Sequence, residues 1–227
     1  MELRRLDAWI VDGTALPSRA VRAALKAGEV VVQGEVVRDG ARRVPADAEV
    51  TLRAEPVLCP PRLAMWHKPV GTLSTHRDPW GRAGAETAPG PLGAASWHPV
   101  GRLDQDTSGL LLFSRDGGVT QHLLHPRRAL PRTYVAKVEG LPDATLATCL
   151  ADGVETADGR VCADVLGLVG DEVTLTVHEG RYRMVRRMLA NAGHPVVQLH
   201  RLAYAGVRLG ELAPGAWRFV EDAEVGG

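Results

Sequence analysis

Two carboxylates, Asp104 and Asp106, precede an apolar run in GRLDQDTSGLLLFSRDGG, residues 101–118. The apolar residues 110–113 predict a buried strand, and glycines bracket the segment. A carboxylate on a turn beside a buried strand is a common placement for a catalytic group. The same Asp and Thr side chains could instead build a turn by bonding their own backbone. The residue types alone leave both interpretations open.

The spacing of these two carboxylates fits two further kinds of chemistry. On an extended strand both side chains would share a face and could hold a metal, but no His or third carboxylate is close in sequence. They could also serve a retaining glycosidase, although carbohydrate sites usually expose aromatic side chains and only 4% of this chain is aromatic. His122 and His125 lie three apart on a predicted helix, but no acid completes a zinc set. We therefore expect no metal site.

A stretch rich in arginine offers a second kind of chemistry. No acidic residue occurs between Glu179 and Glu211, where the arginines are Arg181, Arg183, Arg186, Arg187, Arg201 and Arg208. Helical spacing places Met184, Val185, Met188 and Leu189 on one apolar face and Arg183, Arg186 and Arg187 opposite. The arginine face could simply be solvated. The lack of acidic neighbours favours contact with RNA phosphates, even though the net charge of the chain is zero.

The chain divides near a proline-rich segment, EPVLCPPR, so we expect a small domain over 1–58, a linker over 59–62 and a larger domain over 63–227. In the small domain, Ser18 is a suitable N-cap and Gly28 a suitable end for a helix. The following VVVQGEVV predicts a hairpin that turns at Gln33 and Gly34.

The larger domain shows no regular alternation of strands and helices. Strands are predicted at LAMWHK, GLLLFSR, TYVAKVEG, VTLTVHEG and PVVQLHR, and helices at ATLATCLA, capped by Asp143, and at RMVRRMLANAG. This order favours an α+β fold with a mixed, largely antiparallel sheet flanked by helices. The 45% hydrophobic content can fill such a core without disulfides or a structural metal.

Cysteine use and hydropathy set the expected compartment. Cys59, Cys149 and Cys162 form no metal-type spacing, so we expect reduced thiols. The first residues lack the apolar run of a signal peptide, and no stretch approaches the length of a membrane span. We expect a cytoplasmic protein with no membrane partner. A monomer is expected because no apolar helix face is left over.

Four segments together resemble the pseudouridine synthases of the ribosomal small-subunit and large-subunit type: GRLDQDTSGLLLFSRDGG, HKPVGTLSTHRDP, RTYVAKVEG and EGRYRMVRRM. The resemblance implies an enzyme that isomerises uridine in ribosomal RNA and needs no cofactor. It implies that Asp104 is the catalytic nucleophile or base, that Tyr134 stacks on the uracil and that Arg186 pairs with Asp104. Met184 departs from the family, which usually carries Gln there.

The small domain resembles the S-four RNA-binding domain, named for a small-subunit ribosomal protein, through RLDAWI, SRAVRAALKAGEVVVQGEVV and VPADAEVTL. Together the resemblances imply RNA contacts by Arg102, Lys68, Arg181, Arg183, Arg187, Arg19, Arg22 and Lys26. Arg181-Tyr182 stands where the large-subunit enzymes typically have Lys-Asn, which favours a 16S ribosomal RNA target, free or in the small-subunit particle. The alternatives are a 23S ribosomal RNA uridine or a protein that only binds RNA.

Overall fold

The computed structural model of the chain describes residues 3–14, 16–45, 47–58, 61–76, 78–94 and 96–225. Its contacts form two compact units, Met1–Pro61 and Arg62–Gly227. Each unit has a hydrophobic core of its own. Cys59 and Pro60, within the predicted linker, lie outside the described residues.

The first unit combines two helices with short strands. In chain order these are β1 (Leu3–Arg5), α1 (Leu6–Thr14), α2 (Ser18–Ala27), β2 (Val30–Val32), β3 (Glu35–Val36), β4 (Arg43–Pro45), β5 (Val50–Leu52) and β6 (Glu55–Pro56). One sheet has the order β3-β2-β5-β6, and β1 pairs with β4. All the pairs are antiparallel.

Residues suited to turns explain where the helices and strands of this unit end. Gly28 ends α2 in the left-handed conformation, with φ 77°, as predicted. Gln33 and Gly34 both have positive φ, which matches the tight hairpin predicted between β2 and β3. The prediction of Ser18 as N-cap is wrong: Pro17 holds that position and no side chain caps the helix. Pro17 already has the extended backbone that an N-cap needs.

Helix α2 separates its apolar and basic residues. Val21, Ala24 and Leu25 are buried in the core of the unit. Three basic side chains on the helix are exposed: Arg19, Arg22 and Lys26. Their spacing of three and four residues places them together along one side.

The second unit is built on a nine-stranded sheet. The strands of this unit are β7 (Leu63–Lys68), β8 (His98–Pro99), β9 (Thr107–Ser114), β10 (Arg132–Val138), β11 (Val154–Thr156), β12 (Gly159–Val161), β13 (Asp164–Val169), β14 (Glu172–Val177), β15 (Val196–Tyr204), β16 (Val207–Arg208) and β17 (Trp217–Val220), of which β11 and β12 form a separate pair. Its helices are α3 (Gly117–Leu124), α4 (Ala144–Asp152) and α5 (Met184–Asn191), with 3₁₀ turns at Ala85–Thr87, Gly90–Gly93, Pro126–Arg128 and Asp222–Glu224.

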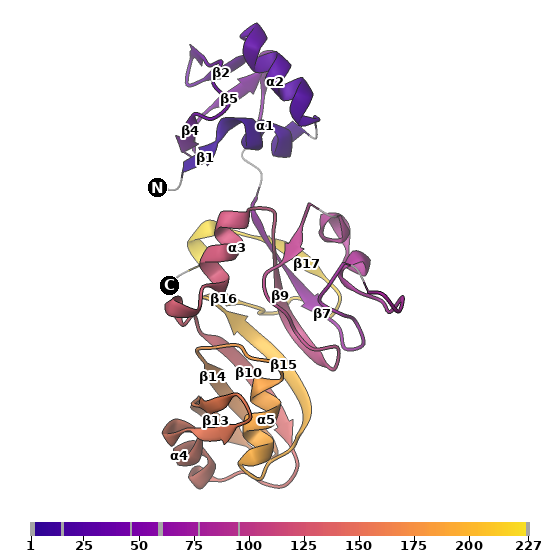
Figure 1. Cartoon of the computed structure of the whole chain (residues 1–227), viewed down its shortest axis with the longest axis vertical. Helices are drawn as coiled ribbons and strands as arrows, with labels where there is room; N and C mark the ends of the chain where they lie inside the picture. The colour runs from indigo at the N-terminus through magenta and orange to yellow at the C-terminus, as the bar shows by residue number, and fades with distance from the viewer. Residues whose placement is uncertain are drawn as a thin grey trace. The chain divides into compact units, whose positions relative to one another are not determined.

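The main path of the sheet runs β13-β14-β10-β15-β9-β7-β17, with β16 beside β15 and β8 beside β9. Only β9 and β15 run parallel among the described pairs; the others are antiparallel. The predicted α+β class with a mixed, largely antiparallel sheet is confirmed. Figure 1 shows α5 lying along β10 and β15, and Asp143 caps α4 by accepting from the N–H of Thr145, as predicted.

The central strands are apolar on both faces because both faces are covered. On β9, Leu111 and Phe113 pack into one core, and Leu110 and Leu112 pack into another. The first core also receives the apolar sides of α4 and α5. Residues that alternate in a strand point to opposite faces. The run of buried residues on β7 has the same cause.

The parallel pair brings two distant segments to the middle of the sheet. Thr107 lies beside Leu199, and Gly109 lies beside Arg201. Gly109 has φ 106°, and a Cβ there would lie 2.3 Å from the carbonyl oxygen of Arg201. Only glycine allows this approach. The start of β9, and the carboxylates before it, are therefore fixed against β15.

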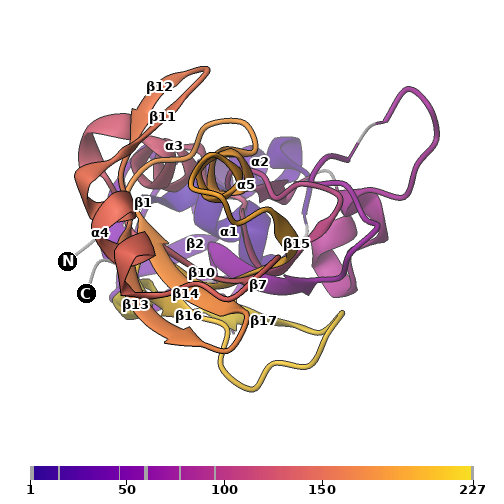
Figure 2. The same cartoon turned by 90° about the horizontal axis from the view of Figure 1, so that it is seen from below.

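Some elements were not predicted from the sequence. The hairpin β11–β12 stands apart from the main sheet in Figure 2, and β17 closes the sheet edge against β7. Both are short strands without clear alternation. No helix among the described residues is long and apolar enough to cross a membrane.

Candidate active site

A pocket of about 700 Å³ opens in the second unit. The turn before β9 contributes Asp104, β10 contributes Tyr134, β15 contributes Arg201, and the start of α5 contributes Arg183 and Met184. Four elements that are far apart in the chain thus converge on one cavity. A cavity of this size, in which several polar groups converge, is a candidate ligand site.

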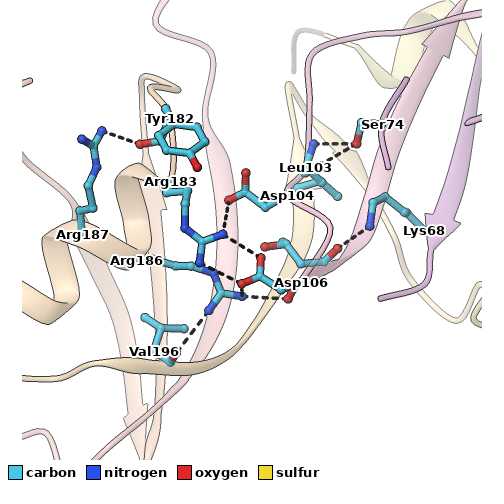
Figure 3. A network of polar contacts seen from close by, with 11 residues as sticks. Lys68, Ser74, Leu103, Asp104, Asp106, Tyr182, Arg183, Arg186, Arg187 and Val196 are labelled. Atoms are coloured by element: carbon cyan, nitrogen blue, oxygen red, sulfur yellow. Dashed lines mark hydrogen bonds and ion pairs between the residues drawn. The ribbon is translucent and has the colours of Figure 1, made fainter. Parts of the chain in front are cut away.

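Asp104 lies on the turn that leads into β9 and lines the pocket. Its backbone carbonyl accepts from the N–H of Thr107 at 3.1 Å. Its side chain is 25% exposed, and Oδ2 lies 3.9 Å from Nη1 of Arg183 (Figure 3). This carboxylate is therefore held near one guanidinium while part of it stays accessible to a ligand in the pocket.

The neighbouring Asp106 is bound much more tightly. Arg183 donates to both of its carboxylate oxygens, at 3.2 and 2.9 Å. Nη2 of Arg186 lies 3.4 Å from Oδ2 of Asp106 and donates to its backbone carbonyl at 2.8 Å. Burial acts to raise the pKa of Asp106, but the hydrogen bond from Arg183 and the charges of both arginines outweigh it and lower that pKa.

The predicted pairing of Arg186 with Asp104 is therefore corrected. Arg183 is the arginine nearest Asp104, and the ion pair of Arg186 goes to Asp106. Arg183 occupies the N-cap of α5 in the left-handed conformation, with φ 48°, which is unfavourable for a residue other than glycine. That conformation accompanies a side chain directed at the carboxylates, an example of local strain at a functional site.

Four arginines of the stretch have acidic partners. They come from segments far away in sequence or just before the stretch: Asp106 for Arg183 and Arg186, Asp158 for Arg187, and Glu179 for Arg181. The absence of acidic residues between positions 179 and 211 of the sequence therefore did not leave these four arginines without ion pairs. The fold supplies the partners through the turn before β9 and through the loop between β11 and β12.

Lys68 does not fit the predicted contact with RNA. Its side chain is fully buried, and Nζ donates to the carbonyl oxygens of Thr107 and Pro69 at 2.8 and 3.0 Å. Burial lowers the pKa of Lys68 to about 8, although the charges of Asp106 and Asp104 oppose this. A side chain at this depth cannot reach a phosphate outside. Lys68 instead binds the backbone carbonyl of Thr107, the first residue of β9.

A second segment holds the turn that carries Asp104, a role that the sequence did not predict for it. The Ser74 hydroxyl donates to the carbonyl of Leu103 and accepts from its N–H, at 2.8 and 3.0 Å. Gln105 exchanges hydrogen bonds with Gly71, at 2.8 and 2.9 Å. Both partners lie in HKPVGTLSTHRDP, so that motif carried the signal, without showing which atoms would meet.

The other predicted residues occupy different settings. Tyr134 is 8% exposed and lines the pocket. Arg102, Arg181 and Tyr182 are exposed along its rim, and Tyr182 is 70% exposed. Arg187 is half-buried under the Tyr182 ring, with the guanidinium carbon 5.9 Å from the ring centre. The apolar face predicted for α5 is confirmed, since its four residues are buried.

No group of three or more His, Cys, Asp or Glu side chains suited to a metal is found among the described residues. His122 lies on α3 and His125 follows it, at the edge of the pocket. Cys149 and Cys162 are free and exposed. The site is thus composed of carboxylates, guanidinium groups and tyrosine rings.

Comparison with known proteins identifies the family of the chain. Residues 62–191 match the family described as RNA pseudouridylate synthase. The chain is 34% identical over 240 residues to ribosomal large subunit pseudouridine synthase B of Bacillus subtilis, covering 98% of this chain and 94% of that protein. It is 32% identical over 226 residues to ribosomal small subunit pseudouridine synthase A of Vibrio cholerae, covering 97% of each.

A solved structure extends the similarity to the whole fold. It is described as a crystal structure of pseudouridylate synthase, has 27% identity and a TM-score of 0.66, and the match covers 97% of both chains. The alternatives of a protein that only binds RNA and of a glycoside hydrolase do not explain these matches. The chain belongs to the RNA pseudouridylate synthase family and is an RNA pseudouridine synthase.

Proposed function

We propose that this enzyme isomerises one specific uridine of 16S ribosomal RNA, with Asp104 as its essential catalytic residue. The observation that carries the catalytic role is the position of Asp104, partly exposed in the pocket and 3.9 Å from a guanidinium. A carboxylate in this position can act as nucleophile or base. The neighbouring Asp106 is occupied by two arginines and is less free to react.

The reaction moves a base without a net change of oxidation state. The bond from the ribose anomeric carbon to N1 of uracil breaks, the base turns, and C5 bonds to the same carbon. C5 then loses its proton and N1 gains one, so that atoms and charge balance. A base that has left the RNA helix needs a surface on which to stack. Tyr134, in the pocket wall, supplies that ring in this proposal.

Two basic surfaces support RNA as the ligand of the whole chain. Arg102 and Arg181 lie exposed at the rim of the pocket, where they can meet phosphates beside the target. In the first unit, α2 exposes the three basic residues described above. We propose that this unit is an S-four-like module that contributes affinity and placement, because phosphate contacts are mainly electrostatic.

The choice of 16S ribosomal RNA rests on Tyr182. This exposed ring stands at the pocket rim, supported by Arg187 beneath it. Stacking on such a ring contributes on the order of 1–3 kcal/mol per base, enough to discriminate between flanking nucleotides. A 23S ribosomal RNA target is the second candidate, because the Bacillus subtilis relative is named for the large subunit.

The test is to map pseudouridines in both ribosomal RNAs from cells with and without the gene. We expect one site in 16S RNA to disappear, and to return when the wild-type gene is restored but not the Asp104→Asn gene. Purified enzyme should then release tritium from 16S transcripts labelled at C5 of uridine. A site lost only from 23S RNA would overturn the 16S assignment and leave the chemistry intact.

A further inference from the structure

Arg201 is a buried charge of the pocket for which the described residues provide no ion-pair partner. It lies on β15, is 2% exposed and lines the cavity. Its Nε donates to the carbonyl oxygen of Leu110 at 2.7 Å. Its Nη2 is buried and has no hydrogen-bond partner, and no carboxylate of the described chain forms an ion pair with it.

Two other buried arginines show how this chain usually treats such a group. Arg4 and Arg62 are 7% and 5% exposed, and each has an aspartate at 3.4 Å, Asp12 and Asp116. A buried guanidinium without an acceptor is costly. The contrast indicates that the partner of Arg201 is a ligand of the pocket rather than one of the described residues.

The surroundings of Arg201 narrow the identity of that partner. Arg201 lies directly opposite Tyr134 in the antiparallel pair of β15 and β10, so the two side chains share one face of the sheet. The ring of Tyr204 lies 5.3 Å from the guanidinium carbon. At 2% exposure, the group is too deep for the RNA backbone outside. It can be reached by a base that enters the pocket and stacks on Tyr134.

The chemistry of the reaction supplies a reason for a cation at that depth. When the glycosidic bond breaks, its electron pair leaves with N1, and the detached uracil carries negative charge on N1 and its carbonyl oxygens. The charge disappears when C5 attacks the anomeric carbon. The proton on C5 then leaves and N1 gains a proton, which gives neutral pseudouridine. A preorganised donor aimed at the charge that develops is effective catalysis in a pocket that excludes water.

We propose that Arg201 is a further catalytic residue, which donates a hydrogen bond to a uracil carbonyl oxygen and stabilises the detached base. The proposal rests on the proposed function of Asp104 and Tyr134. It assigns Asp104 and Arg201 to different parts of the substrate. The carboxylate of Asp104 acts on the ribose as nucleophile or removes a proton as base, and the guanidinium of Arg201 binds the uracil. The planar donors of arginine suit a carbonyl edge.

The first test replaces Arg201 by Met, which keeps much of the volume and removes the charge. The purified full chain should bind unlabelled 16S RNA within about threefold of wild type but release tritium at least about 100-fold more slowly in a single turnover. Arg201→Lys should recover part of the rate. The matched control is Arg62→Met, which removes another buried guanidinium of the same unit outside the pocket and should keep near-normal rate. A folded Arg201→Met enzyme with wild-type rate would overturn the proposal.

A second measurement compares RNA substrates, and its first comparison uses wild-type enzyme alone, so that this comparison does not depend on the folding of a variant. Synthetic RNA stem-loops around the mapped uridine would carry 2-thiouridine or 4-thiouridine, because sulfur accepts hydrogen bonds more weakly than oxygen. We expect one of the two to slow the reaction by about tenfold, and to have no further effect in a folded Arg201→Met enzyme. Equal rates for both thio-RNAs and uridine would refute a contact with a carbonyl. If the proposed function itself were wrong, wild type would release no tritium from any of these RNAs.

Discussion

Two groups of basic residues, one in each unit, look alike in sequence and differ in structure. Arg19, Arg22 and Lys26 on α2 are exposed, and none of the described acidic residues forms an ion pair with them. Arg183 and Arg186, at the start of α5, are bound to Asp106. Both helices present basic residues opposite an apolar face. The first group is available to an external anion, whereas the second has become part of the scaffold.

A cluster of basic residues in the sequence therefore does not reveal what each arginine does. At α5 the guanidinium groups hold a turn of their own protein and fix the carboxylate that precedes β9. At α2 the same kind of pattern leaves the charges in solvent. The four predictions below separate the two uses, because scaffold charges should affect rate and stability while solvent charges should affect affinity and its salt dependence.

The largest effect is expected for Asp104→Asn. The change removes the reactive carboxylate and keeps its shape, so tritium release should fall below detection, at least about 1,000-fold. RNA affinity should stay within a few-fold, measured by filter binding. The matched variant Asp106→Asn should keep measurable turnover, since its role here is to hold arginines. Near-normal activity of Asp104→Asn would sink the mechanism.

Replacing an arginine of the scaffold should give the next largest effect. Arg186→Met removes the hydrogen bonds to Asp106 and Val196. The single-turnover rate should fall roughly 100-fold, and urea unfolding should show a loss of about 1–3 kcal/mol. The loss is smaller than for a fully buried pair because Asp106 is 47% exposed. If the variant proved as stable and active as wild type, the turn would have to be held by other groups.

Lys68 differs from both groups of basic residues, because it is buried and its ammonium group donates only to carbonyl oxygens. Its pKa is about 8 in the folded protein, against 10.5 for an ordinary lysine side chain. Between these two pH values Lys68 carries its proton in the unfolded chain but has lost it in the folded chain. The free energy of unfolding therefore increases as pH rises from 8 to 10.5, by up to about 3 kcal/mol from this group. Below pH 8 both states carry the proton and the gain is absent.

The measurement is the free energy of unfolding from pH 7 to 10.5 for wild type and Lys68→Met. Subtracting the two curves removes the contribution of other titrating groups. The wild type should gain on the variant as pH rises. Parallel curves would mean that Lys68 keeps an ordinary pKa in the folded chain.

The smallest effect is expected at α2. Changing Arg19, Arg22 and Lys26 together to Gln should weaken binding to 16S RNA by about tenfold at moderate salt and flatten the salt slope by about 2. The rate at saturating RNA should not change, because these residues belong to the first unit. An unchanged affinity and slope would reduce α2 to a structural element.

Much of the fold could be predicted because its signals are local. The apolar run of β7, the end of α2 at Gly28 and the cap of α4 by Asp143 depend on residues close in sequence. Asp104 and Tyr134 entered through motif resemblance, and the pocket contains both. Their catalytic roles stay predictions until the variants are measured.

The geometry of the site could not be predicted in the same way. The partner of Arg183 lies 77 residues away, and its positive φ is set by tertiary contacts rather than by its own preference. The burial of Lys68 depends on the strands around β7, which no local pattern describes. Sequence indicated which residues matter more reliably than which atoms meet.

The parallel pairing of β9 with β15 affects when the protein can fold during its synthesis. During synthesis the carboxylates emerge well before β15, since Ser108 and His200, bonded at 2.8 Å, are 92 positions apart. Pairings between such distant segments form late in folding. The pocket therefore cannot assemble until almost all of the second unit has left the ribosome. A nascent chain that already carries Asp104 is thus an inactive one, and activity begins only with a nearly complete polypeptide.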